Sequence, residues 1–148
     1  MIRLGTKIFL AIGLLVGSTS AFSEPELFVI ECKVSGWYWT GATEAKITNQ
    51  EIVVTVISKP PAASIRVDGS GHLNIGVILG NDALVSNDSI HVVEDTKSNL
   101  RGTRTTISIN RITGFIDIAE IISRRGTDSL DMTTASGFCS KASNKQKF

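Results

Sequence analysis

The residues of this chain that could carry out chemistry are two histidines, two cysteines and a scattered set of carboxylates. Neither His72 nor His91 has a second histidine, cysteine or carboxylate at a local spacing typical of a metal site or a catalytic dyad. The chain also lacks the G-x-S-x-G motif of serine hydrolases and the glycine-rich loops that bind phosphates. We therefore expect both histidines to be ordinary sheet residues, and we expect no catalytic residue, no metal and no cofactor.

Carboxylates offer the one enzymatic alternative. A hydrolase of the glycosidase type needs two carboxyl groups about 5–10 Å apart. The sequence alone does not place any two of them at this separation, so we interpret them as solvent-exposed charges in loops and at strand edges. The candidates are Asp82, Asp88, Glu94, Asp95, Asp117, Asp128 and Asp131.

The densest aromatic cluster is Trp37-Tyr38-Trp39. On a strand, Trp37 and Trp39 point to one face and Tyr38 points to the other. Paired indole rings can form a platform for a sugar or an apolar ligand, or they can anchor a protein interface. The favoured interpretation is that the rings fill one end of a β-barrel as core. Contact with a ligand or partner is the alternative, and it makes these three residues the candidate site of the chain.

The first residues are typical of a secretory signal peptide. Arg3 and Lys7 precede a nine-residue apolar run at 8–16, and small residues follow it. A membrane-spanning helix needs about 20 residues, so this run is too short to be an anchor. We expect cleavage after Ala21 or Ser23, and therefore a secreted or periplasmic protein.

Removal of residues 1–23 leaves a single domain at 24–148, with no transmembrane segment expected in it. The formal net charge of the whole chain is +1, from 15 Lys and Arg against 14 Asp and Glu. Such a near balance argues against a nucleic-acid-binding protein, which would carry a basic stripe. The last residues, 141–148, contain three lysines and no acid, and we expect them to form a flexible tail.

Strand patterns dominate the domain, and short polar turns separate them. The pattern predicts an all-β fold, a small antiparallel meander that forms a barrel or a sandwich. Residues 116–125 are ambiguous, but their isoleucine content and their place after a turn favour a strand over a short helix. The strand-like segments lie at 27–34, 52–57, 73–79, 90–93, 105–110 and 115–122.

Cys32 and Cys139 lie near opposite ends of this domain. An even number of cysteines in an exported chain, without a C-x-x-C pattern, favours one structural disulfide over metal ligands or a redox pair. We expect the bridge to join the first strand of the domain to the last, because the two ends of a meander meet when its sheet closes. Chain-entropy arguments give such a long loop about 4–5 kcal/mol of stabilisation.

The segment 107–115, with the sequence ISINRITGF, predicts a hairpin in which Gly114 takes a positive φ. With the early Cys32 and the late Gly137-Phe138-Cys139, it resembles a loose group of small secreted bacterial β-proteins of unknown function. The resemblance implies export, a β fold and the disulfide, and it implies nothing about chemistry. Arg111 and Thr113 are therefore interpreted as turn residues.

Three functions remain as hypotheses. The first is a non-enzymatic interaction or binding module of the cell envelope or the extracellular space, with an unknown protein or small ligand as its partner. The second is a β-barrel that binds a small ligand, which a deep cavity containing Trp37 or Trp39 would favour. The third, a carboxylate-based hydrolase, would need a cleft with two close carboxylates.

Overall fold

The computed structural model describes residues 26–59, 62–80 and 83–141. The predicted signal peptide lies outside these residues, and so does the predicted tail except for Lys141, which ends the last strand. The described part consists of nine strands and one short 3-10 helix. They are β1 (Glu26–Thr40), β2 (Thr43–Lys59), β3 (Ala62–Asp68), η1 (Gly71–Leu73), β4 (Gly76–Gly80), β5 (Leu84–Val85), β6 (Ser89–Lys97), β7 (Arg101–Asn110), β8 (Phe115–Arg124) and β9 (Leu130–Lys141).

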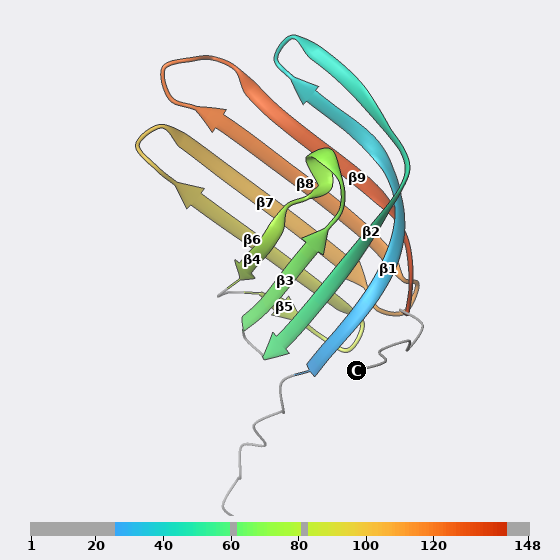
Figure 1. The fold of residues 1–148 in the computed structure, drawn as a ribbon. Coiled ribbons are helices and arrows are strands. Elements are labelled where there is room, and N and C mark those ends of the chain that lie inside the picture. Colours follow the sequence, from blue (N-terminus) through green and yellow to red (C-terminus); the bar gives the residue numbers. More distant parts are fainter. Residues whose placement is uncertain (1–25, 60–61, 81–82, 142–148) are drawn as a thin grey trace, which may run out of the picture.

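All nine strands belong to one antiparallel sheet, in the order β4-β3-β2-β1-β9-β8-β7-β6-β5. The sheet therefore consists of two meanders, β1–β4 and β5–β9, joined where β1 pairs with β9. It curls into a half-barrel (Figure 1), so the prediction of an all-β, barrel-like meander is confirmed. The hairpins β1–β2, β6–β7 and β8–β9 all end on one side of the half-barrel, at the top of Figure 1. We call this side the hairpin end.

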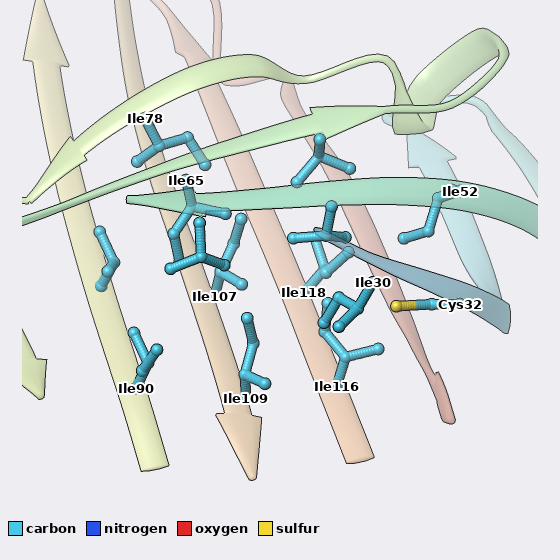
Figure 2. Close-up of a cluster of buried hydrophobic side chains, with 14 of the residues drawn as sticks. Ile30, Cys32, Ile52, Ile65, Ile78, Ile90, Ile107, Ile109, Ile116 and Ile118 are labelled. Atoms are coloured by element: carbon cyan, nitrogen blue, oxygen red, sulfur yellow. The ribbon is translucent and has the colours of Figure 1, made fainter. Parts of the chain in front are cut away.

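The concave face of the sheet holds the core. Alternate residues of the long strands are buried there, because successive side chains of a strand point to opposite faces. Side chains from β2–β4 face those from β6–β8 across the interior (Figure 2). Burying one such side chain contributes about 1.5–3 kcal/mol. The largest fully buried side chains are Ile52, Ile65, Leu73, Ile78, Ile90, Ile107, Ile116, Ile118, Val34, Val54, Val56 and Val67.

The opening of the half-barrel lies between the two meanders. Here the edge strand β4 approaches β6, and the Leu79 backbone N–H donates a hydrogen bond to the Glu94 carboxylate at 3.2 Å. A β-carbon on Gly80 would lie 2.5 Å from a methyl group of Val92, so the missing side chain allows the strands to come this close. Side-chain contacts therefore replace part of the backbone pairing that a closed barrel would have.

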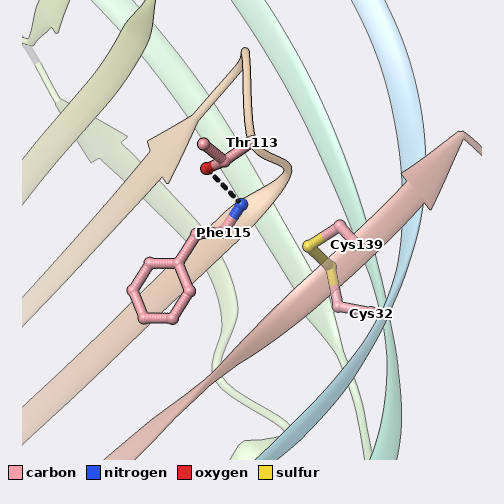
Figure 3. The surroundings of a disulfide bond; sticks show 4 residues. All are labelled: Cys32, Thr113, Phe115 and Cys139. Atoms are coloured by element: carbon pink, nitrogen blue, oxygen red, sulfur yellow. Dashed lines mark hydrogen bonds between the residues drawn. A yellow bond between two sulfur atoms is a disulfide. The ribbon is translucent and has the colours of Figure 1, made fainter.

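The predicted disulfide joins Cys32 of β1 to Cys139 of β9 (Figure 3). The two cysteines are directly opposite each other in the β1–β9 pairing. The bridge therefore links the two meanders covalently at the β1–β9 pairing, where they join. The expectation that it links the first strand to the last is confirmed.

The predicted hairpin connects β7 to β8, and residues 116–125 are strand as far as Arg124. The Asn110 side chain accepts hydrogen bonds from the N–H groups of Ile112 and Thr113. Gly114 has a φ of 72°. The Thr113 hydroxyl then accepts the N–H of Phe115 (Figure 3). Side chains of the INRITG segment thus fix the turn, as the sequence predicted.

The predicted strand over 73–79 is wrong in its first half. Residues 71–73 form η1, and β4 begins only at Gly76, which has a φ of 80°. The left-handed Gly76 turns the chain at the start of β4, so the alternation of faces does not run on from Leu73. Leu73 and Ile78 are therefore both buried although one number is odd and the other even, while Val77 is exposed. Strand β3 was not predicted, although its alternating valine and isoleucine residues point into the core.

Candidate functional site

Trp37 and Trp39 lie on the convex face of the sheet, and their exposed fractions are 49% and 39%. The interpretation of these rings as core is therefore wrong. The reason is the alternation of β1: Cys32 and Val34 are buried, so the odd-numbered residues that follow point outward. Tyr38 occupies the opposite face and packs against the core. The three residues of the candidate site are thus divided between two surfaces.

The tryptophans belong to a larger exposed surface near the hairpin end. Trp39 lies opposite Met132 of β9, and Met132 lies opposite Ile121 of β8. These side chains form a row across three strands, with Met132 40% and Ile121 39% exposed. Trp37 is two residues from Trp39 on the same face, and the Lys46 ammonium lies 5.8 Å from its ring centroid. We call Trp37, Trp39, Met132 and Ile121 the convex apolar patch.

Tyr38 takes part in a polar cluster on the concave face. Its ring stacks on His72 of η1, with centroids 3.2 Å apart and planes at 11°. Nearby, Glu120 of β8 lies directly opposite Thr105 of β7, and the charges of Arg101 and His72 act on its carboxyl. Burial raises the pKa of the Glu120 carboxyl, and these three neighbours oppose the rise only in part. The core face therefore becomes polar toward the hairpin end.

A second concave carboxylate is held by its own arginine. Asp131 of β9 has a side chain only 12% exposed, and its Oδ2 lies 2.8 Å from Nη2 of Arg124. This ion pair fixes the Asp131 carboxylate and gives it a structural partner.

The other carboxylates named from the sequence lie elsewhere. Glu94 binds the edge of β4. Asp82 lies outside the described residues. Exposed positions away from the concave cluster are occupied by Asp88, Asp95, Asp117 and Asp128.

A hollow of about 320 Å³ opens at the hairpin end, between the β6–β7 hairpin and the end of β8. Neither tryptophan lines it. Four of its seven lining residues are cationic and none is acidic, so its lining is strongly positive. We call it the basic notch, and its residues are Lys97, Ser98, Arg101, Gly102, Ser123, Arg124 and Arg125.

Sequence reasoning missed Glu120 and the arginines of the notch. Glu120 continues the alternation of Ile116 and Ile118, a signal that places this carboxylate on the buried face. The notch gives no such signal, because Lys97 and Arg101 flank one turn while Arg124 and Arg125 lie at another. Only the pairing of β7 with β8 brings them together.

His91 lies in β6, as expected for a sheet residue, whereas His72 lies in η1 and not in a strand, so the expectation is wrong for His72. Both histidines have structural partners. His91 hydrogen-bonds through Nδ1 to the Ser108 hydroxyl, 2.7 Å away on the neighbouring strand, and His72 stacks on Tyr38. Within residues 26–59, 62–80 and 83–141, no group of three His, Cys, Asp or Glu side chains is arranged to hold a metal ion. The same residues contain no helix that is long and apolar enough to cross a membrane.

Comparisons of the chain with models of known protein families, with curated proteins and with solved structures found no match.

Proposed function

We propose that this chain is an exported, non-enzymatic binding module that docks a protein partner on its convex apolar patch. The observation that carries the proposal is the exposure of both tryptophans on one face, in a row with Met132 and Ile121. Tryptophan is the residue type most enriched among the energetic centres of protein interfaces, and methionine is also enriched there.

The shape of the patch favours a macromolecule over a small ligand. A small ligand needs a concave pocket that encloses most of its surface. The patch lies on the outside of a curled sheet. The concave face directly behind it holds the polar cluster of Tyr38 and His72, and aliphatic side chains fill the rest of the interior (Figure 2). These observations do not support the alternative of a ligand-binding barrel with a tryptophan-lined cavity.

The rim of the patch carries both signs of charge. Glu44 and Lys46 of β2 flank the two tryptophans, directly opposite Trp39 and Trp37. On the far side, Arg104 of β7 lies opposite Ile121 and pairs with Asp95 at 3.7 Å. An apolar centre with a mixed polar rim is the usual anatomy of a protein–protein interface. It does not resemble the single-sign surface that binds a nucleic acid.

The disulfide supports the export part of the proposal, because disulfides persist in oxidising compartments such as the periplasm and the extracellular space. Mass spectrometry of the protein recovered outside the cytoplasm tests this part. We expect an N-terminus near residue 22 or 24, produced by cleavage after Ala21 or Ser23. A protein that keeps Met1 and remains in the cytoplasm contradicts export.

The docking part is tested with two matched double variants, Trp37→Ser/Trp39→Ser and Phe115→Ser/Phe138→Ser. The phenylalanines form the other exposed aromatic pair of the convex face, with ring centroids 5.4 Å apart. The binding partner is captured from envelope extract, identified and purified. We expect the tryptophan variant to lose at least about thirtyfold in affinity, since even one such anchor contributes about 2 kcal/mol or more.

Fluorescence gives an independent measurement, because the chain contains only two tryptophans and both lie in the patch. Docking should shift their emission to shorter wavelength. Equal loss of affinity in both double variants, or binding without a change in emission, contradicts the proposal. If the protein associates with itself and only the tryptophan variant abolishes this association, the partner is a second copy of this chain.

A further inference from the structure

We propose that the basic notch binds the phosphoryl or sulfate group of an anionic ligand. It lies apart from the convex apolar patch, and it does not depend on the function proposed above. The notch brings together four cationic side chains from the ends of β6, β7 and β8. Its volume, about 320 Å³, is roughly ten times that of one water molecule in the liquid. It therefore has room for an anion and part of the group that carries it.

The backbone around the notch is fixed by hydrogen bonds. The Ser98 hydroxyl accepts the N–H groups of Leu100 and Arg101 and donates to the Arg101 carbonyl. The Arg125 N–H donates to the Leu100 carbonyl at 3.0 Å, which ties the two turns together. These bonds hold the bases of the cationic side chains in place before any ligand arrives, so less entropy is lost on binding.

Two of the arginines are also held from the concave side. Asp131 binds one nitrogen of Arg124, and Glu120 attracts Arg101. Each guanidinium has five N–H donors in a planar fork, so an anchored arginine keeps donors for a second anion. Lys97 and Arg125 complete the set with exposed charges. Four cations against two buried or half-buried carboxylates leave an excess of positive charge facing the notch.

The number of donors in this set suits a tetrahedral oxyanion, which offers more oxygens than a carboxylate does. An arginine fork binds two oxygens of such a group in a bidentate manner, and lysine adds a point charge. The hydroxyl groups of Ser98 and Ser123 can bind further oxygens. Such a group can come from a soluble phosphorylated or sulfated molecule or from an anionic lipid head group. Leu100, 78% exposed at the tip of the β6–β7 hairpin, lies beside the notch and would meet the lipid in the second case.

The test is an amide NMR titration of the purified protein with inorganic phosphate and inorganic sulfate. We expect saturable shifts confined to residues 97–102 and 123–125. The double variant Lys97→Gln/Arg125→Gln should weaken binding at least about tenfold, since the loss of even one charged hydrogen bond, about 1.5 kcal/mol, lowers affinity by that factor. The control variant Lys33→Gln/Arg104→Gln removes the same charge from exposed positions on the convex face and should change affinity less than twofold.

Vesicles distinguish the two sources of the anion. Neutral phosphatidylcholine vesicles are compared with vesicles that also contain phosphatidylglycerol. Binding to the second kind alone, lost in both the notch variant and Leu100→Ser, assigns the site to a lipid head group. Binding of free phosphate without vesicle binding assigns it to a soluble ligand. The proposal is overturned if no probe binds, or if the control variant weakens binding as much as the notch variant does.

Discussion

Replacing Gly114 with alanine should destabilise the protein far more than the same replacement at Gly126. Both glycines lie in hairpin turns beside β8, with φ values of 72° and 83°. In this left-handed region, any residue with a β-carbon costs about 1–2 kcal/mol. This strain is common to both variants, so it cancels in the comparison.

The difference comes from what the new β-carbon meets. At Gly114 it would lie 2.7 Å from the backbone oxygen of Cys139, whereas at Gly126 no atom lies within 4 Å. The oxygen cannot move alone, because the Cys139 N–H donates a 2.8 Å hydrogen bond to the Gly114 carbonyl. Relieving the overlap costs about 1–3 kcal/mol, and loss of the hydrogen bond adds about 1 kcal/mol. We expect a total of about 3 kcal/mol or more at Gly114, against about 1–2 kcal/mol at Gly126.

Urea unfolding of the oxidised protein measures both free energies, with the disulfide intact in each variant. The midpoint should fall strongly for Gly114→Ala and modestly for Gly126→Ala. If the two variants lose the same stability, the contact between the hairpin and β9 carries no energy and the reasoning is refuted. A variant at Gly114 that is as stable as wild type would also remove the argument for a required positive φ.

Three further predictions concern stability. The double change Cys32→Ser/Cys139→Ser should lower the free energy of unfolding by about 2–5 kcal/mol in urea titration, and an unchanged midpoint contradicts this. Glu120→Gln should gain stability relative to wild type as the pH rises above the ordinary glutamate range, because folding raises the pKa of this carboxyl and its ionisation therefore weakens the wild-type fold. Thermal melts of both proteins across that pH range measure the difference in stability. Melting temperatures that change in parallel with pH refute the prediction. Arg111→Ala removes hydrogen bonds to Glu26 and to a backbone carbonyl, and it should lower the free energy of unfolding by about 1–3 kcal/mol. The control Arg66→Ala, at an exposed ion pair, should change it by no more than about 1 kcal/mol in the same thermal melts. Equal losses in the two variants contradict a structural role for Arg111.

Local patterns predicted much of the fold. The sequence showed the alternation in β1, β7 and β8 and the INRITG turn, because these depend on neighbouring residues. It also showed the disulfide, because two cysteines allow only one pairing. The alternation of β1 also contained the answer for the tryptophans. If the strand is continued beyond Val34 and its residues are assigned alternately to the two faces, Trp37 and Trp39 fall on the outer face.

Long-range geometry was not predictable in the same way. The strand expected at 73–79 failed because one glycine, Gly76, takes a positive φ that hydrophobicity alone does not reveal. The opening of the sheet falls between β4 and the two-residue β5, in the middle of the chain. The basic notch depends on which hairpins are adjacent, a property of the whole sheet.

The place of β9 in the sheet sets the order in which the strands of this protein can pair. Among the described residues, the strand nearest the C-terminus lies in the middle of the sheet, between β1 and β8, and its cysteine pairs with one 107 residues earlier. Until β9 pairs with them, β1 and β8 each present an unpaired edge, and the two meanders meet only where β4 approaches β6. Contacts so distant along the chain slow folding. Under the export proposed above, a chain that has not yet closed its sheet can still be threaded, unfolded, across a membrane.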